Sequence, residues 1–101
     1  MADIAITREE TEAGGRYIAR LDGVASEMTF TRARRKGQAL MMIDHTGVPS
    51  VLSGRGVGLA LAARAVEDAR AEKFRIVPLC SFVRLMSQRH KDWQDVLAPQ
   101  G

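Results

Sequence analysis

Residues 52–58 read LSGRGVG and separate an apolar, strand-like segment from a longer helical one. The three glycines, Gly54, Gly56 and Gly58, leave successive backbone N–H groups uncovered by side chains. The helix that follows adds the unpaired donors of its first turn and the positive end of its dipole, so an anion such as a diphosphate can bind here. Glycine also serves simply to turn the chain or to let a helix pack closely, and this structural interpretation stays open.

The segments that flank this loop predict a strand, a helix and a second strand. Residues 38–44 (QALMMID) are apolar on both faces, which is typical of a strand with neighbours on both sides. From Val57 onward the apolar residues keep helical spacing and charged residues take the other faces, so we expect an amphipathic helix over residues 55–73. Residues 75–79 (RIVPL) predict a strand, which the right-handed crossover rule makes parallel to strand 38–44.

The N-terminal part predicts antiparallel strands. Residues 17–30 alternate with period two on either side of Asp22-Gly23, a dipeptide that suits a type I′ hairpin turn. A short strand at residues 4–6 is expected before this hairpin, connected to it by residues 11–15, and the polar run 31–37 (TRARRKG) is expected to be a loop. The fold class is therefore α+β: a mixed sheet, antiparallel at first and parallel in the second half, with two main helices.

The second helix is expected over residues 81–90, with Ser81 as its N-cap. Its inward face is expected to comprise Phe82, Leu85 and Met86. The basic residues at its C-terminal end are expected to complement the helix dipole without a catalytic role.

Length and composition indicate one domain over residues 1–101. The 101 residues fall below the usual length of about 150 per domain. Apolar residues make up 46% and charged residues 27%, which excludes a disordered chain.

The longest apolar stretch, residues 57–63, is far shorter than the roughly 20 residues of a membrane span, and the N-terminus lacks the apolar segment of a signal peptide. With one cysteine, Cys80, an internal disulfide is excluded, and we expect a cytoplasmic protein without a membrane partner.

Standard phosphate-binding motifs do not match the glycine loop, but a family pattern does. No Lys-Ser or Lys-Thr pair follows the glycines, and the third glycine comes too early for G-x-G-x-x-G. The remaining x-x-G-x-G pattern resembles the pyrophosphate loop of the GNAT superfamily of N-acetyltransferases. The ordered motifs HTGVP (45–49), LSGRGVG (52–58) and VPLC (77–80) are similar to H-T-x-V-P, L-x-G-x-G-[IV]-G and V-P-L-C of its short, single-domain subfamily. The resemblance covers about residues 17–97.

This resemblance implies a GNAT-like (acyl-CoA N-acyltransferase) fold whose sheet splays between the strands at Met41 and Ile76. It implies acetyl-CoA as cosubstrate in that opening, an unidentified amine as acceptor, and no metal. Val48 matches the position whose backbone meets the pantetheine, and Arg55 to Leu59 match the pyrophosphate loop. The expected coenzyme A contacts are therefore Val48, Gly54, Arg55, Gly56, Val57, Gly58 and Leu59.

Three departures from the superfamily pattern stand out. The superfamily commonly has Gln or Arg at the position of Ser53. It places two helices between its first two strands to build the acceptor site, where this chain has only residues 11–15, so the acceptor side is open, completed by another subunit, or adapted to a large substrate. Its members often use a tyrosine of the last helix as general acid, whereas the single tyrosine here, Tyr17, lies in the early hairpin.

Two residues are candidates for catalysis. Cys80 lies where the last helix begins, so the helix dipole favours its thiolate; it is either the acetyl-accepting nucleophile, a thiol that lines the site, or a small buried residue. His45 ends the strand beside the expected opening and is either a general base or a structural imidazole. Asp44 is a weaker candidate base.

Two further function classes stay open. A non-catalytic module that binds coenzyme A as a sensor would explain the missing acceptor helices and tyrosine. The twelve arginines and three lysines give a net charge of +3, and they are densest at residues 32–36. We expect this basic run to be a solvated loop. The alternatives are that it contacts the 3′-phosphate of coenzyme A or that it binds nucleic acid. No aromatic residues are interleaved with the basic ones for base stacking.

Overall fold

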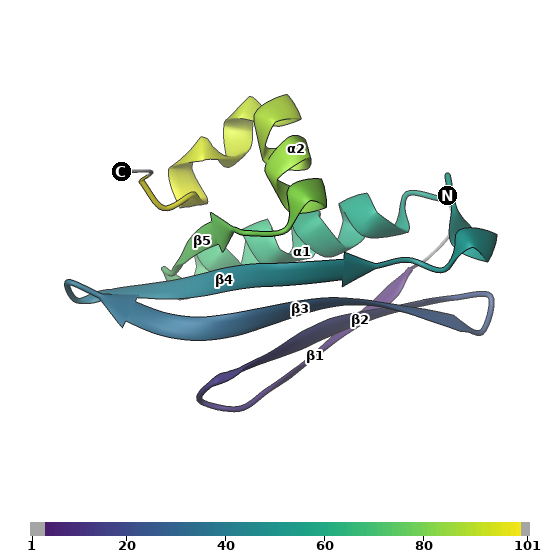
Figure 1. The fold of residues 1–101 in the computed structure, drawn as a ribbon, viewed down its shortest axis with the longest axis horizontal. Helices are drawn as coiled ribbons and strands as arrows, with labels where there is room; N and C mark the ends of the chain where they lie inside the picture. The colour runs from purple at the N-terminus through teal and green to yellow at the C-terminus, as the bar shows by residue number, and fades with distance from the viewer. Residues whose placement is uncertain (1–3, 100–101) are drawn as a thin grey trace.

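The computed structural model describes residues 4–99 and contains one five-stranded sheet in the order β1-β2-β3-β4-β5 (Figure 1). The first four strands pair antiparallel, and β5 pairs parallel to β4. The mixed α+β sheet expected from the sequence is confirmed. The strands are β1 (Ala5–Glu10), β2 (Gly14–Leu21), β3 (Val24–Arg35), β4 (Gln38–Gly47) and β5 (Arg75–Pro78).

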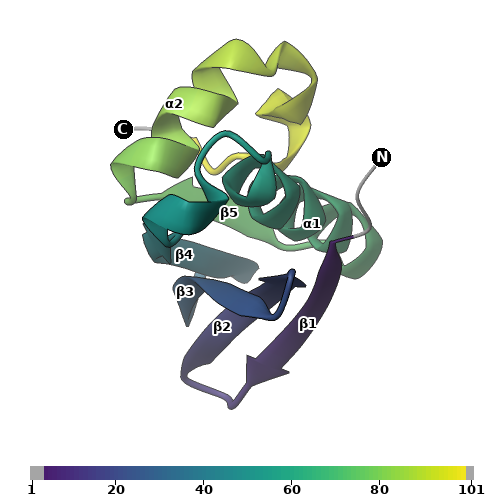
Figure 2. The ribbon, with the colours of Figure 1, turned by 90° about the vertical axis from the view of Figure 1, so that its right-hand side faces the viewer.

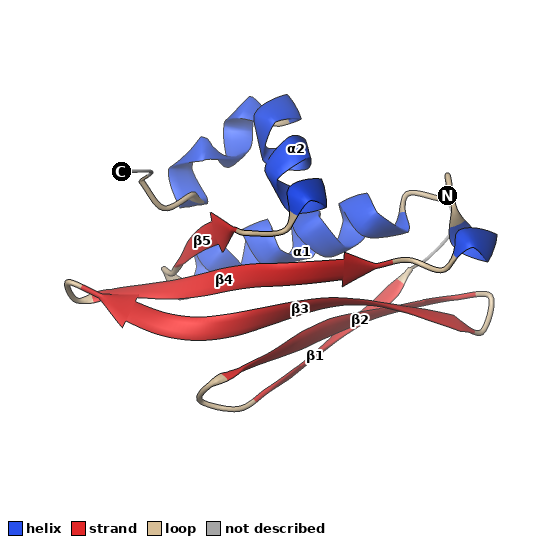
Figure 3. Cartoon of the chain, viewed as in Figure 1, coloured by secondary structure: helices blue, strands red, loops and turns tan. Residues whose placement is uncertain are grey.

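Two α-helices and two short 3₁₀ helices complete the fold (Figure 3). Helix α1 connects β4 to β5, and the sheet curves around one side of it (Figure 2). Helix α2 packs beside β4 and β5 and also touches α1. The helices are η1 (Ser50–Leu52), α1 (Val57–Glu72), α2 (Ser81–Arg89) and η2 (Lys91–Val96).

A single hydrophobic core fills the space between α1 and the sheet. The alternation predicted for the β2–β3 hairpin places one set of side chains against the helix, and Tyr17, Ala19, Met28 and Phe30 are all buried there. The apolar stripe of α1 faces them. The hairpin turn has φ 52° at Asp22 and 74° at Gly23, as a type I′ turn requires.

The prediction of a loop over residues 31–37 was wrong. Strand β3 continues to Arg35 and pairs with β4 as far as Gln38, so only Lys36 and Gly37 turn the chain, both with positive φ. This polar stretch forms a strand because Arg32 finds partners on the core side: it binds Glu10 with Nε 2.9 Å from Oε2. Its guanidinium also lies 4.4 Å from the centre of the Phe74 ring, a cation–π contact.

The expectations for α2 need two corrections. Leu85 is 43% exposed, and the buried positions of the helix are Val83, Met86 and Ser87, because the helix rotates its apolar face by about one residue from the expected one. The N-cap is Cys80 and not Ser81, and no side-chain hydrogen bond caps this helix.

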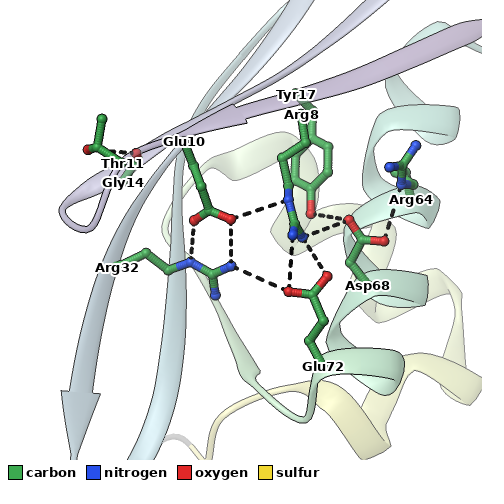
Figure 4. Close-up of polar contacts among 9 residues, drawn as sticks. All are labelled: Arg8, Glu10, Thr11, Gly14, Tyr17, Arg32, Arg64, Asp68 and Glu72. Atoms are coloured by element: carbon green, nitrogen blue, oxygen red, sulfur yellow. Dashed lines mark hydrogen bonds and ion pairs between the residues drawn. The ribbon is translucent and has the colours of Figure 1, made fainter.

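A polar network ties β1 to the second half of α1 (Figure 4). The Arg8 guanidinium donates to Asp68 at 3.0 Å and to Glu72 at 2.8 Å. The buried Tyr17 hydroxyl donates to the same Asp68 oxygen at 2.8 Å, so this carboxylate is held from two strands. Burial raises the pKa of Tyr17, and its hydroxyl serves as a structural donor. The network fixes the outer strands against the helix.

Candidate functional site

The opening implied by the resemblance lies where β4 and β5 part. Their parallel pairing spans only Leu40–Ile43 and Arg75–Pro78. The Ile43 carbonyl accepts the last hydrogen bonds across the gap, from the backbone N–H groups of Leu79 at 3.1 Å and Cys80 at 2.9 Å. Strand β4 then runs on to Gly47 while the other chain turns away into α2. One edge of β4 is thus left without a strand partner beyond Ile43.

The glycine loop delivers the chain into α1 with its backbone donors uncovered. Gly54 and Gly56 have φ of 76° and 79°, in the left-handed region that favours glycine, and a Cβ at either position would meet only open space. The first helical bond is donated by the Ala60 N–H to the Gly56 carbonyl. The three preceding N–H groups of α1 have no helical acceptor, and no side chain of residues 4–99 caps them. No acidic residue lies in the first turn.

Gly58 serves a different purpose from the other two glycines. A Cβ there would lie 2.7 Å from Cζ of Phe82, closer than atoms approach in proteins. The absent side chain lets the first turns of α1 and α2 approach each other. The structural interpretation therefore holds for all three glycines: Gly54 and Gly56 turn the chain, and Gly58 allows close helix packing. Anion binding at this loop stays a prediction.

A cavity of about 410 Å³ lies between this loop, the end of β4 and the start of α2. Six of the seven residues expected to contact coenzyme A line it, so the structure brings the predicted set together. Arg55 is the exception, because its Nη2 lies 3.3 Å from Oδ2 of Asp22 in the β2–β3 turn. The lining residues are Thr46, Val48, Ser50, Leu52, Ser53, Gly54, Gly56, Val57, Gly58, Leu59 and Phe82.

Thr46 and Phe82 are lining residues that sequence reasoning missed. Thr46 lies near the end of β4, and Val48 follows just after that strand ends. Phe82 stands two positions after Cys80, in the first turn of α2. Thr46 belongs to the HTGVP motif, and Phe82 follows the VPLC motif by two positions.

Cys80 lies directly behind Thr46. Its side chain is buried, with Sγ 3.5 Å from the Thr46 hydroxyl oxygen. Burial raises the pKa of the Cys80 thiol, but hydrogen bonds from the Thr46 hydroxyl and from the backbone N–H groups of Val83 and Phe82 favour the thiolate and bring the net pKa below its ordinary value. The helix start thus stabilises a negative sulfur next to the cavity.

His45 does not share this location. It neighbours Thr46 in an extended strand, so its side chain points to the opposite face of β4, where it is exposed and lies next to Gly47. Asp44 stands at a register shift between β3 and β4, and its carboxylate accepts a 2.8 Å hydrogen bond from Thr31. The structure therefore brings Cys80 and Thr46 together and leaves His45 apart from them.

A second cavity, of about 480 Å³, adjoins the first and shares Val48 with it. It lies along β2 and β3 and is lined by two arginines, Arg16 and Arg20. Within residues 4–99, no group of three or more His, Cys, Asp or Glu side chains is arranged to hold a metal ion. Over the same residues, no helix is long and apolar enough to cross a membrane.

Comparisons with known proteins agree with this geometry. The sequence model of a family described as GCN5-related N-acetyl-transferase matches residues 16–96. The fold is similar to the crystal structure of a ribosomal-protein-alanine N-acetyltransferase from Brucella melitensis biovar Abortus 2308, with a TM-score of 0.66 and 20% sequence identity. The match covers 90% of this chain and 66% of that one, so this chain spans just under two thirds of its length. No curated protein matches the sequence. Because the family match spans most of the chain, from the β2–β3 hairpin through α2, the chain belongs to the GCN5-related N-acetyl-transferase family.

Proposed function

We propose that this protein binds acetyl-CoA in the 410 Å³ cavity and transfers the acetyl group to an amine. The observation that carries the proposal is the first turn of α1, whose three unpaired N–H groups open into the cavity between Gly56 and Phe82. These donors and the helix dipole suit a diphosphate without any charged side chain. The pantetheine arm then follows the free edge of β4 from Val48 toward Thr46, pairing with backbone as an added strand does.

The reaction requires a neutral amine to attack the thioester carbonyl. The amine nitrogen forms the new C–N bond, the C–S bond breaks, coenzyme A leaves as a thiolate, and the nitrogen loses one proton to a base or to solvent. Thr46 lines the cavity, and Cys80 lies behind it with Sγ 3.5 Å from the Thr46 hydroxyl oxygen, near where the arm would end. A thiolate favoured by the start of α2 is able to take the amine proton or to accept the acetyl group itself.

His45 is assigned a role on the acceptor side. Its imidazole faces the surface of β4 opposite Thr46, so it meets an amine that approaches from outside the cavity rather than the thioester within it. Among residues 4–99, strand β2 follows β1 without an intervening helix that could cover that face of the sheet. An exposed face suits a polypeptide amine better than a small molecule that must be enclosed.

Turnover with a panel of amines tests the proposal. The panel contains a peptide with an N-terminal alanine, chosen because the similar crystal structure is of a ribosomal-protein-alanine N-acetyltransferase, a lysine peptide, and a polyamine. We expect acetyl-CoA-dependent thiol release with one of these amines and its loss in Gly56→Val. Tight coenzyme A binding without turnover on any amine would favour the sensor function instead.

Intact mass after incubation with acetyl-CoA separates the two roles of Cys80. An acetyl adduct in the wild type that is absent in Cys80→Ala identifies the thiol as acetyl acceptor. Turnover by Cys80→Ala at the wild-type rate would remove the thiol from the mechanism. The cytoplasmic location expected from the sequence stays a prediction, and cell fractionation tests it.

A further inference from the structure

Five cations gather at the end of the molecule away from the glycine loop. The β3–β4 turn, the end of α1 and the start of β5 lie together there (Figure 1). The side-chain amide of Gln38 joins two of these segments, because it donates to the carbonyl of Lys73 at 3.2 Å. The parallel pairing with β4 brings Arg75 opposite Leu40. We call this surface the basic end, and its cations are Arg34, Arg35, Lys36, Lys73 and Arg75.

The cations of the basic end have no acidic partner. Arg34 and Arg75 donate only to backbone, to the carbonyls of Gly37 at 2.7 Å and Leu97 at 3.2 Å. The side chains of the other three make no hydrogen bond or ion pair with any residue from 4 to 99. These five charges exceed the chain's net charge of +3, so the rest of the chain is acidic on balance. The positive charge of this protein is therefore concentrated at the basic end.

Two of these cations are lysines at positions where the backbone favours other residues. Lys36 has φ 50° and Lys73 has φ 61°, both in the left-handed region. Glycine or asparagine adopts this conformation with less strain, so the turns themselves do not require lysine. Both lysine side chains are exposed. What lysine adds at these two turns is an exposed charge.

A cavity of about 290 Å³ opens beside Lys73 and Arg75. Arg70 lines it as well, but its guanidinium is paired with Asp95 at 2.9 Å. Among residues 4–99, Asp95 is the one acidic residue of the lining. An anionic group that enters this cavity meets two cations without acidic partners, and guanidinium and ammonium groups both bind phosphate oxygens.

Coenzyme A bound at the glycine loop does not reach the basic end. Helix α1 has 16 residues and separates the two places by about 24 Å. The 3′-phosphate of coenzyme A is attached to the ribose next to the diphosphate, so it stays near the other end of the helix. Of the two ligands that the sequence left open for the basic run 32–36, nucleic acid is the one whose position fits.

We propose that the basic end binds the phosphate backbone of a double-stranded nucleic acid. Strands β3, β4 and β5 are neighbours in the sheet, so the cations that they carry spread over roughly 10 Å. A duplex presents about six phosphate charges over that length, one for about every 1.7 Å of its axis. An extended acidic polypeptide presents only about three, one for each residue of about 3.3 Å. The duplex therefore matches five clustered cations better.

The surroundings of the cations favour a duplex over a single strand. Single strands bind by stacking their bases on exposed aromatic side chains. Phe74, next to Lys73 in the chain, is only 3% exposed. Contacts to phosphate alone carry no sequence information, so we expect binding without sequence preference. This activity is independent of the proposed acetyl transfer.

Fluorescence anisotropy with a labelled DNA duplex tests the proposal. We expect a dissociation constant in the micromolar range for a duplex of about 20 base pairs at about 100 mM salt. The logarithm of the affinity should fall with the logarithm of the salt concentration with a slope of about −4, slightly less than one per cation.

A double substitution, Lys36→Gln with Lys73→Gln, removes two of the cations and keeps side chains of similar length. We expect the slope to become shallower by about two and the affinity to fall about tenfold or more at low salt. Thermal unfolding should be retained, because neither side chain has a partner within residues 4–99. Coenzyme A affinity should be unchanged.

Arg20→Gln with Arg84→Gln is the matched control. It removes the same charge from two arginines without a carboxylate partner. Arg20 lies beside the β2–β3 turn and Arg84 in the first turns of α2, both away from the basic end. This variant should keep the wild-type slope to within about one and most of the affinity.

Four results would overturn the proposal. They are no duplex binding at low salt, an equal loss of affinity in the lysine variant and its control, tighter binding of a single strand of the same sequence, and equally tight binding of an oligoglutamate of the same charge. The last result would make an acidic polypeptide the partner. None of them bears on acetyl-CoA, whereas failure to bind coenzyme A would overturn the proposed function and leave duplex binding standing.

Discussion

The two ends of helix α1 are built in opposite ways. At its C-terminal end, Lys73 closes the helix in the left-handed conformation, and its carbonyl accepts a hydrogen bond from Gln38 at 3.2 Å. Arg70 binds Asp95 at 2.9 Å, and Glu72 binds Arg8. At the N-terminal end, Gly56 offers no side chain, and three N–H groups stay unpaired. The chain thus uses charged side chains to hold one end of α1 and leaves backbone donors at the other end, where we propose that the ligand binds.

Substitution at the open end should give the largest effect on ligand binding. Gly56→Val places a side chain on a residue whose backbone is in the left-handed conformation, beside the free N–H groups of α1. We expect the dissociation constant for coenzyme A to rise on the order of hundredfold, from the loss of charge-assisted backbone hydrogen bonds. The backbone strain itself costs only about 1–2 kcal/mol of folding stability. Calorimetry measures the affinity and thermal unfolding the stability.

Gly37→Val is the matched control. Gly37 has the same left-handed conformation, φ 81°, and open space around its Cβ, but it lies in the distant β3–β4 turn. It should lose similar stability and keep its affinity. An equal loss of affinity in both variants would show that strain, and not the open helix end, controls binding.

Substitution at the closed end should act on stability instead. Arg8→Ala removes the ion pairs to Asp68 and Glu72, of which Asp68 has a side chain only 14% exposed. We expect the free energy of unfolding to fall by about 1–2 kcal/mol, with coenzyme A affinity unchanged. Urea unfolding measures the loss. Arg35→Ala, on a residue with no ion pair among residues 4–99, should leave stability within about 0.5 kcal/mol of the wild type. A fall in affinity for Arg8→Ala would contradict the division of roles.

The start of α2 is a second helix end to compare, because hydrogen bonds there favour the thiolate form of Cys80 and lower its pKa. Thr46→Val removes the hydroxyl next to Cys80 while keeping the shape of the side chain. Because that hydroxyl favours the charged sulfur, its loss should raise the pKa of the Cys80 thiol. The pH profile of the rate of iodoacetamide alkylation should therefore move to higher pH. Thr29→Val, on the neighbouring strand, should leave the profile in place; a common profile for all three proteins would refute the role of Thr46.

The smallest effect is expected at Arg55. Its ion pair with Asp22 is exposed on both sides, so Asp22→Asn should change coenzyme A affinity by no more than about threefold. The direction should be tighter binding, because the released guanidinium becomes available to phosphate. The change should vanish when Arg55→Gln is present as well, as a double-mutant cycle by calorimetry will show. Persistence of the change without Arg55 would assign it to another charge.

Local patterns predicted most of the fold. Asp22-Gly23 fixed the hairpin through its positive φ values, and the apolar periodicities located β4 and α1. The polar run 31–35 was misread because its strand depends on partners distant in sequence: Arg32 is held by Glu10 and Phe74, which no window around residue 32 contains. The inward face of α2 was misplaced for the same reason, since packing against the rest of the molecule decides its rotation.

The parts of the candidate site that the backbone forms could be predicted from the sequence, whereas the parts that depend on side-chain contacts were harder to predict. The glycine loop located five of the lining residues, because φ and the helix start follow from local sequence, and the resemblance of the HTGVP motif added Val48. The ion pair of Arg55 with Asp22 spans 33 positions of the chain and leaves no local signal. The separation of His45 from Cys80 did leave a local signal in the sequence. His45 and Thr46 are adjacent in β4, so their side chains point to opposite faces, and Thr46 is the one that faces the cysteine.

The most direct test of the open helix end is a titration of ¹⁵N-labelled protein with coenzyme A, followed by amide NMR shifts. We expect large, saturable shifts for the amides of Gly54, Gly56, Val57, Gly58 and Leu59, with little change at Lys73 and its neighbours at the closed end of α1. Binding that shifts other amides and leaves those five unchanged would contradict this prediction.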